Sequence, residues 1–448
     1  MATKGPSRRP RRRHTKPKRA SRSELIPSGP TSVHHIPDHL LELVLLRVGS
    51  SLALLRAAFT CKRWRRIIAD TSFLTQFRLL HAPHVPGHYH IIDPSHDKLP
   101  PDGNNQVFVP DTSTTDTLDR RHFSLDFLPD ADWELGDSRG GLLLLYRRNL
   151  TEYWRQLQFP DMIVCDPLRR RYQGILCWEE MSSHQCLGLF LLDGVAGDDI
   201  DCGRISMSSF RVLVVVSQNF FFEDGQPAPS ACVFSSGSDG GWQQSAAGSS
   251  VHIAEFSLIS FVGRARSSLY WRMEHESVVL ALDETTMEFS LVTFLSTVVG
   301  MPDVSSTFRV IGGHDADDTV VRVVRIINNG DLRVFANLKG SDDWVTEKLV
   351  RLPEATRGLP GYGETYFQAP AKIVAANTRY ILVAPQEEES WIVSVDLQTL
   401  EVQRTHERNS YAGAAYSYEL PWPPALRACP GAGAGRRRHR RINMPAMF

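Results

Sequence analysis

The sequence predicts an α+β multidomain chain, with a small three-helix module near the N-terminus followed by an all-β domain. Between residues 36 and 73, apolar side chains recur at helical spacing. Beyond about residue 125, short and often β-branched runs alternate with clusters of Gly, Asp, Asn and Pro, as strands and turns do. No long helical pattern interrupts these runs, which argues against a parallel sheet with crossover helices. At 448 residues, the chain has room for two or three domains.

The helical segment carries more apolar surface than it could bury by itself. Pro37 suits the first turn of a helix, and Asp38 can cap the amides that follow. One face of this helix would carry five aliphatic residues, namely Leu40, Leu41, Val44, Leu45 and Val48. Leu43 and Leu46 make the other face apolar too. Fewer than about 40 residues rarely sustain an independent core, so the segment needs a neighbour, either the rest of this chain or another protein.

This segment also resembles an F-box. The aliphatic-Pro pair Ile36-Pro37 opens the family pattern, and the Cys-Lys-x-Trp-Arg run at 61–65 closes it, followed by aliphatic residues and Phe73. Ile36 replaces the usual Leu, and the Gly-Ser-Ser link at 49–51 replaces one that more often contains Pro. The residues alone leave open an ordinary three-helix piece that packs on its own domain.

The F-box resemblance implies docking onto the Skp adaptor of a cullin-type ubiquitin ligase. The residues expected to bind the adaptor are Ile36, Pro37, Leu40, Leu41, Val44, Leu45, Val48, Leu52, Leu55, Cys61 and Trp64. Of these, Pro37, Leu40, Val44, Leu45 and Val48 are expected to lie nearest the partner.

Internal repeats indicate how the all-β domain is organised. Residues 279–289 and 392–402 align without a gap, so that Asp283 corresponds to Asp396, and a weaker copy surrounds Asp166. Each copy predicts a strand, a tight turn and a second strand, with the Asp side chain bonding turn amides. A second unit, at 233–242 and 334–344, joins a Val-Phe strand to a Trp. The two units alternate at intervals of 49 to 68 residues, which predicts small antiparallel sheets arranged radially, a β-propeller. A β-sandwich is the alternative.

The all-β part is similar to the F-box-associated propeller-like domains of plant F-box proteins. The resemblance covers roughly residues 130–429. It rests on the Gly-Leu-Leu-Leu run at 141–144, on Cys165-Asp166-Pro167 with the Arg-Arg-Tyr run at 170–172, and on residues 416–429, which resemble grass members of that family. It implies a fold and a domain order, and it names no ligand.

Together these observations predict five segments. They are a disordered basic tail (1–33), an F-box helical domain (34–78), a linker (79–125), a propeller-like substrate-recognition domain (126–429) and a second disordered basic tail (430–448). The linker assignment depends on six prolines between residues 83 and 110. His81, His84, His88 and His90 could suggest zinc, but no Cys or suitably spaced acid accompanies them, so we expect a polar linker and no metal.

Charge is strongly segregated along the chain. The formal net charge is zero, yet residues 1–23 hold ten Lys or Arg and no acid, and residues 421–448 hold six Arg and no acid. The body between the tails has a formal charge of −16, which argues against broad contact with nucleic acid. The N-terminal cluster resembles a nuclear localisation signal, and nonspecific nucleic-acid contact or a tail without function are its rivals. The candidate import residues are Arg8, Arg9, Arg11, Arg12, Arg13, Lys16, Lys18 and Arg19.

The sequence shows no catalytic or cofactor motif that we would defend. His275-Glu276 begins a zinc-protease motif that lacks its second His, and the acids at 315–318 lack the Gly and the closing Glu of a calcium loop. Seven scattered cysteines without a CxxC pair favour a reducing compartment. No apolar run is long enough to span a membrane, and the N-terminus lacks the apolar core of a secretory signal.

The sequence therefore predicts a non-catalytic substrate-recognition adaptor of an SCF-type ubiquitin ligase, located in the nucleus, the cytoplasm or both. Its predicted partners are a Skp-type adaptor, through it a cullin ligase, and a target protein that the sequence does not identify. The alternatives are a stand-alone propeller interaction scaffold, or a sugar-binding or glycan-active propeller.

Overall fold

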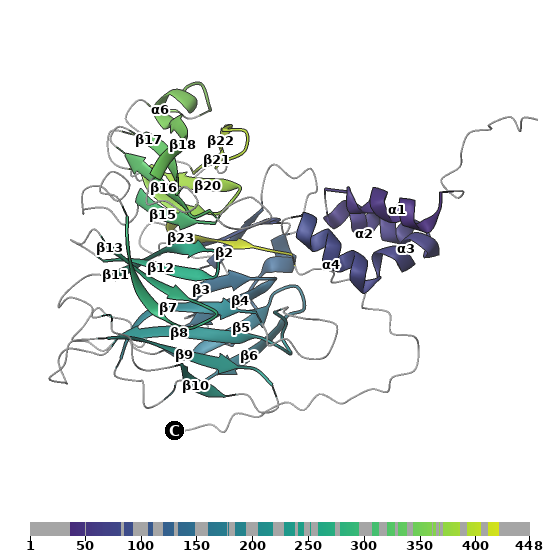
Figure 1. Cartoon of the computed structure of the whole chain (residues 1–448), viewed down its shortest axis with the longest axis horizontal. Helices are drawn as coiled ribbons and strands as arrows, with labels where there is room; N and C mark the ends of the chain where they lie inside the picture. Colours follow the sequence, from purple (N-terminus) through teal and green to yellow (C-terminus); the bar gives the residue numbers. More distant parts are fainter. Residues whose placement is uncertain are drawn as a thin grey trace, which may run out of the picture.

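The structure is a computed structural model. It describes residues 36–49, 51–81, 85–92, 106–110, 120–129, 133–147, 160–176, 178, 184–193, 205–217, 228–237, 241–245, 251, 259–273, 278–294, 307–312, 320–327, 330–337, 344–360, 362–363, 367, 371–385, 392–404 and 411–420. Figure 1 shows a helical domain beside a larger assembly of strands.

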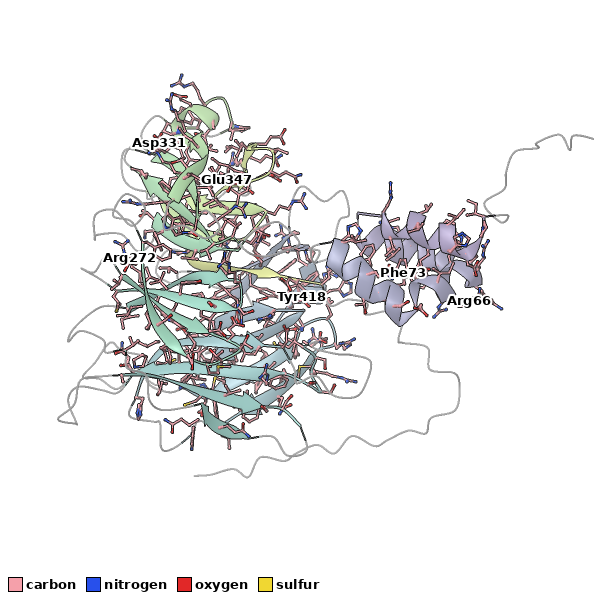
Figure 2. All side chains as sticks on the ribbon, in the orientation of Figure 1. Arg66, Phe73, Arg272, Asp331, Glu347 and Tyr418 are labelled. Carbon is pink, nitrogen blue, oxygen red and sulfur yellow. The ribbon has the colours of Figure 1, made fainter. Side chains whose placement is uncertain are left out.

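The helical domain contains four described helices rather than the three that the sequence predicted. They are α1 (Asp38–Leu46), α2 (Ser51–Thr60), α3 (Lys62–Ile68) and α4 (Thr71–Leu80). The prediction missed α4, which begins because the Asp70 carboxylate accepts hydrogen bonds from the amides of Ser72 (2.9 Å) and Phe73 (3.4 Å). The Phe73 side chain is completely buried inside this domain (Figure 2).

The described strands form five sheets, and the eight-stranded one consists of two antiparallel four-stranded halves. We therefore distinguish six antiparallel units, which we call blades 1 to 6. Blade 1 consists of β3 (Glu134–Arg139), β4 (Leu142–Tyr146), β5 (Met162–Asp166) and β6 (Arg171–Ile175). Blade 2 consists of β7 (Gln185–Leu192), β8 (Arg211–Ser217), β9 (Pro229–Ser235) and β10 (Trp242–Ser245). Blade 3 consists of β11 (Ile259–Ala265), β12 (Ser268–Met273), β13 (Val278–Asp283) and β14 (Phe289–Thr293).

The remaining blades continue the same order. Blade 4 consists of β15 (Phe308–Ile311), β16 (Arg322–Ile327), β17 (Asp331–Asn337) and β18 (Trp344–Arg351), followed by the short helix α6 (Leu352–Ala355). Blade 5 consists of β19 (Lys372–Ala376), β20 (Tyr380–Ala384), β21 (Val393–Asp396) and β22 (Val402–Arg404). Blade 6 has three strands, β23 (Tyr411–Tyr418), β1 (Gly87–Ile92) and β2 (Gln106–Pro110). Blades 3 and 4 are joined by parallel pairing between β11 and β15.

The first strands of the six blades close a ring. β3, β7, β11, β15, β19 and β23 each contact the next, and β23 contacts β3 again. Every seam between neighbouring blades has its own cluster of buried apolar side chains, because alternate residues of a strand point to opposite faces of its sheet. A two-layer sandwich would instead bury one face of each sheet in a single core. The arrangement is therefore propeller-like.

The five repeats found in the sequence all occupy the same place in their blades. Each one joins the third strand to the fourth, in blades 1 to 5 in turn. The Asp283 carboxylate accepts from the amides two and three residues later at 2.8 and 2.9 Å, and that of Asp396 does so at 2.7 and 2.9 Å. The fourth residue after each Asp, Arg170, Met287 or Leu400, has a positive φ of 52° to 60°. The repeated hairpins are thus confirmed.

The predicted linker, residues 79–125, is wrong over much of its length. It contains β1, β2 and a 3-10 helix at Arg120–Phe123. β1 pairs with the C-terminal strand β23, with Tyr89 opposite Tyr416 and His90 opposite Ala415. Among the described strands none follows β23, and the sheet of blade 6 is completed by β1 and β2, which come from before blade 1.

Candidate functional site: an exposed apolar strip and a central ionic cluster

Helix α1 exposes an apolar strip to solvent. Leu40, Leu43 and Val44 are 46%, 56% and 58% exposed. They lie at positions i, i+3 and i+4, so their side chains are neighbours on one helix face. Phe59 on α2 is 70% exposed. Aliphatic and aromatic side chains left in water on a small helical domain mark a surface that suits a protein partner.

The predicted adaptor-binding residues differ in how deeply the structure buries them. Leu41 and Leu45 are only 2% exposed and belong to the core of the helical domain, so the expectation that Leu45 lies nearest a partner is wrong. Ile36, Val48 and Trp64 pack partly against the same core, whereas Pro37, Leu40 and Val44 are exposed. The side chains of Leu52 and Leu55 lie outside the described residues.

Cys61 has a local structural role that the sequence did not reveal. It is partly exposed and caps α3, where its Sγ accepts a hydrogen bond from the Trp64 amide at 3.5 Å. The predicted set omitted Leu43 and Phe59, although Leu43 is about as exposed as Val44 and Phe59 is more exposed than either. Their hydrophobicity was visible in the sequence, but the direction in which each helix faces its neighbours was not.

Ion pairs hold the start of α1 against α3. The Asp38 carboxylate accepts from the Arg63 Nε at 2.7 Å and from the Arg66 Nη2 at 2.8 Å, and Arg63 also donates to the Ile36 carbonyl. The hydrogen bond from Arg63 holds the pKa of Asp38 below its usual value. Asp38 therefore links two helices rather than capping α1, whose N-cap is Pro37.

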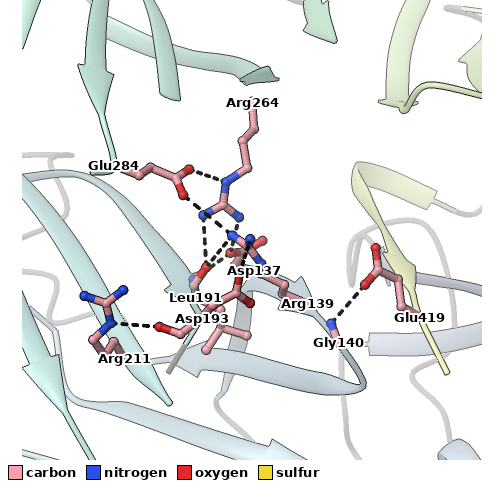
Figure 3. Close-up of polar contacts among 9 residues, drawn as sticks. All are labelled: Asp137, Arg139, Gly140, Leu191, Asp193, Arg211, Arg264, Glu284 and Glu419. Carbon is pink, nitrogen blue, oxygen red and sulfur yellow. Dashed lines mark hydrogen bonds and ion pairs between the residues drawn. The ribbon is translucent and has the colours of Figure 1, made fainter. Parts of the chain in front are cut away.

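A second candidate site is an ionic cluster where blades 1, 2 and 3 meet (Figure 3). The Arg264 guanidinium on β11 pairs with Glu284, donates to the Leu191 carbonyl at 3.0 Å and lies 3.8 Å from an Asp137 carboxylate oxygen. Asp137 on β3 accepts from the Leu191 amide at 2.7 Å. Nearby, Arg139 pairs with Asp193 at 2.8 Å. One guanidinium thereby contacts groups from three blades.

Burial perturbs the acids of this cluster. It raises the pKa of Asp137, and the positive charge of Arg264 opposes that shift. Burial also raises the pKa of Glu419, whose carboxylate accepts from the Gly140 amide at 3.1 Å. Burial alone would lower the pKa of Arg264, but Asp137 and Glu284 hold it above its usual value. Each of these charges has a partner, so the cluster acts as a clamp between blades.

The histidines of the predicted linker lie in structured surroundings. His88 and His90 are buried in β1, and the His88 Nε2 is hydrogen-bonded to the Tyr380 hydroxyl, which lies 3.1 Å from Ser417 Oγ. The His81 Nε2 lies 2.6 Å from the Leu46 carbonyl oxygen. His84 lies outside the described residues. Across the part of the chain that the structure describes, no three His, Cys, Asp or Glu side chains are grouped so that they could hold a metal ion.

Several other predictions concern residues outside the described ranges. These are the two basic tails with all the candidate import residues, the His275-Glu276 pair and the acids at 315–318. The four described cysteines, Cys61, Cys165, Cys186 and Cys232, carry free thiols, and burial raises the pKa of Cys186 to about 12. Of the helices that the structure describes, none combines the length and hydrophobicity needed to cross a membrane.

The comparisons with known proteins identify the helical domain. The F-box-like family matches residues 33–79. No curated protein matches the chain. Among solved structures, the six-bladed β-propeller lectin of Aleuria aurantia is 13% identical with a TM-score of 0.32, covering 65% of this chain and 79% of the lectin. The periplasmic gluconolactonase of Pseudomonas aeruginosa is 13% identical with a TM-score of 0.35, covering 73% of this chain and 84% of that protein.

A third similar structure is prolyl oligopeptidase B from Galerina marginata. It is 10% identical with a TM-score of 0.30, covering 61% of this chain but only 33% of the oligopeptidase. All three TM-scores are below 0.5, and the blades are defined by this chain's own strand pairing and contacts. The chain therefore carries an F-box-like domain at residues 33–79, followed by a β-rich, propeller-like region.

Proposed function

We propose that this chain is the substrate-recognition subunit of an SCF-type ubiquitin ligase. The observation that carries the proposal is the exposed strip of Leu40, Leu43 and Val44 on the first helix of the F-box-like domain. F-box domains bind a Skp adaptor and through it a cullin, and the strip offers the apolar contact that such docking needs. The blades then hold a target protein while another subunit catalyses ubiquitin transfer, so the chain itself is not an enzyme.

The small size of the strip limits the free energy of binding that its burial can contribute. Each of the three side chains is already about half buried, so burying the rest contributes roughly half of the ~1.5–3 kcal/mol expected for a whole aliphatic side chain. Three such residues give about 2–4 kcal/mol, which is less than the usual cost of association. Further contacts are therefore needed, and Phe59 on α2 is a candidate because it is 70% exposed, more than any other large apolar side chain described in this domain.

Two finer points belong to the same proposal. The resemblance of residues 130–429 to grass-type plant F-box proteins supports this domain order. The basic N-terminal cluster supports import into the nucleus, with function there or in the cytoplasm. The acidic body argues against a nucleic-acid target.

Co-purification with a Skp adaptor tests the proposal. The wild-type chain is expected to form a one-to-one complex, and a Leu40→Asp/Val44→Asp variant is expected to lose it, because two charges would be buried without partners. His39→Asp on the same helix is the matched control, since His39 is exposed and outside the strip. A folded, monodisperse wild-type chain that binds no Skp adaptor would refute the proposal.

A further inference from the structure

The outer edge of blade 3 differs from the other outer edges of the ring. β14 ends the strand order of its sheet and pairs only with β13 among the described strands. Its five residues, FSLVT, contain neither a charge nor a proline. Native proteins usually protect exposed edge strands with charges, prolines, bulges or short length, because an unpaired edge accepts another strand.

The other outer strands each carry such a protection. Arg171 lies in β6, Pro110 ends β2, and Glu347 and Lys348 lie in β18 beside a bulge in the β17–β18 pairing. β22 has only three residues. β10 has four, and its Trp242 already stacks on Trp178 with ring centroids 6.2 Å apart.

The register of the β13–β14 hairpin shows which backbone groups of β14 face outward. The Asp283 amide donates to the Glu288 carbonyl at 3.1 Å, so this pair is hydrogen-bonded. Bonded and non-bonded pairs alternate in an antiparallel ladder, so Ser290 and Val292 bond to β13 through their pairs with Ala281 and Val279. The N–H and C=O groups of Phe289, Leu291 and Thr293 then point away from the blade. These are the groups that pair with an added strand.

Side chains on β14 provide an apolar anchor beside these backbone groups. Leu291 is 45% exposed. Phe289, two residues earlier and on the same face, packs partly against the seam between blades 2 and 3. A strand added next to β14 would bring one of its own side chains against Leu291 and extend the apolar surface that Phe289 begins.

We propose that β14 binds an extended segment of a protein target as a fifth strand of blade 3. The segment is uncharged and rich in β-branched residues over about five positions, which span roughly 17 Å, with an apolar side chain facing Leu291. The proposal rests on the proposed function, because that function makes a protein the target. In the view of Figure 1, β11 and β13 of this blade lie on the opposite side of the ring from the helical domain, so both surfaces can be occupied at once.

A second copy of the chain fits the edge less well than a peptide does. Two five-residue edges that meet side by side bury far less than the ~1,200 Å² of a stable protein–protein interface. A single extended peptide needs only this edge, because its main-chain hydrogen bonds supply affinity and Leu291 supplies selectivity.

The test begins with peptide selection on the immobilised full-length chain, using a displayed library of random heptapeptides. Selected peptides are then synthesised and their Kd is measured by fluorescence anisotropy. We expect Leu291→Lys to weaken binding at least tenfold and Val345→Lys on β18 to leave it unchanged. Val345 is a close control because it is 41% exposed on another outer strand.

A second measurement uses only the wild-type chain. We compare two versions of each peptide, one methylated at the odd-numbered backbone nitrogens and one at the even-numbered ones, which we call the two methylation phases. We expect one phase to abolish binding, because those N–H groups pair with β14, and the other to be tolerated. Selected peptides that bind Leu291→Lys as well as wild type, or that tolerate both methylation phases, would overturn the proposal. A wild-type dimer that Leu291→Lys dissociates would also overturn it, since the occupant would then be a second copy.

The outcome can be separated from that of the proposed function. Leu291→Lys is expected to co-purify with the Skp adaptor as well as wild type does, since β14 and the α1 strip are different surfaces. If peptides bind β14 but no adaptor binds the chain, the ligase role fails and strand addition stands. If the adaptor binds and neither peptide test responds, strand addition fails and the ligase role stands.

Discussion

The Tyr418 hydroxyl donates a hydrogen bond to the Gly141 carbonyl at 3.2 Å, which joins the last described strand of the chain to the first blade across 277 residues of sequence. Both the Tyr418 side chain and the surrounding seam are buried. The aromatic ring of Tyr418 packs edge-on against the rings of Tyr89 and Phe123, with centroids 5.7 Å and 5.5 Å apart. This contact closes the ring between blades 6 and 1, and Figure 2 marks the position of Tyr418 in the strand assembly.

Tyr418→Phe should destabilise the ring while keeping the aromatic packing. The substitution removes the hydroxyl donor and leaves the buried Gly141 carbonyl without this hydrogen bond. We expect the free energy of unfolding to fall by about 1–2 kcal/mol. Urea denaturation measures the change. Tyr172→Phe is the control, because Tyr172 is 46% exposed and should change stability by less than about 0.5 kcal/mol. Equal stabilities of Tyr418→Phe and wild type would show that the hydrogen bond does not hold the seam.

Gly263→Ala should disrupt the junction between blades 3 and 4. Gly263 has a φ of +149°, and an added Cβ would lie 1.9 Å from the Val310 carbonyl oxygen, where β11 and β15 pair. Because both atoms belong to the backbone, the strands must separate, and we expect a loss of at least about 3 kcal/mol or failure to fold. Thermal unfolding followed by circular dichroism measures this. Gly174→Ala is the control, since nothing lies within 4 Å of its added Cβ, and a comparable loss there would contradict the argument.

Asp283→Ala and Asp396→Ala should cost nearly the same stability. Their carboxylates accept the same two turn amides at almost equal distances, so each loss is expected to be about 1 kcal/mol. The sites lie in blades 3 and 5, so the effects of the double variant should add. Denaturant titration of the single and double variants checks both points. Asn at either position keeps an acceptor oxygen and should recover much of the loss. Strongly unequal losses would show that the two turns are not energetically equivalent.

Arg264→Met should destabilise the junction of blades 1, 2 and 3, and more so at high pH. Without this guanidinium, Asp137 and Glu284 lose the cation that they share. We expect the free energy of unfolding to fall by about 2–4 kcal/mol. The pKa of Asp137 is already raised by burial and would rise further. An acid whose folded-state pKa exceeds its unfolded value binds protons better when folded, so its contribution to stability is lost as pH rises through the folded pKa.

The measurement is the difference in unfolding free energy between Arg264→Met and wild type at pH 5 and at pH 8. We expect the larger deficit at pH 8. Arg266→Met is the matched control, because Arg266 is exposed two residues away. A deficit independent of pH would show that Arg264 contributes through packing rather than through its charge.

Local signals in the sequence were enough to predict the hairpins of the ring. In each Asp turn, the side chain satisfies amides two and three residues away, so the information needed is contained within one short segment. The repeat of that pattern then indicated small antiparallel sheets. The same reasoning located the F-box-like segment, because the residues that match the family pattern follow one another in the expected order over fewer than 50 positions.

Relationships between distant segments could not be obtained in this way. The proline-rich residues that were expected to form a linker supply β1 and β2. The reason is that β1 pairs with β23, which lies more than 300 residues later in the chain. The unprotected edge of β14 likewise became visible only once the order of strands in its sheet was known.

By itself, the sequence determined the repeated hairpins, their turn chemistry and the presence of an F-box-like segment, because these depend on neighbours along the chain. Only the tertiary structure decided which apolar residues remain outside. Leu41 and Leu45 enter the helical core whereas Leu40, Leu43 and Val44 stay exposed, because burial depends on which helix lies against each face. The closing of the ring by Tyr89 and Tyr418 was decided in the same way, by contacts between the two ends of the β-rich region.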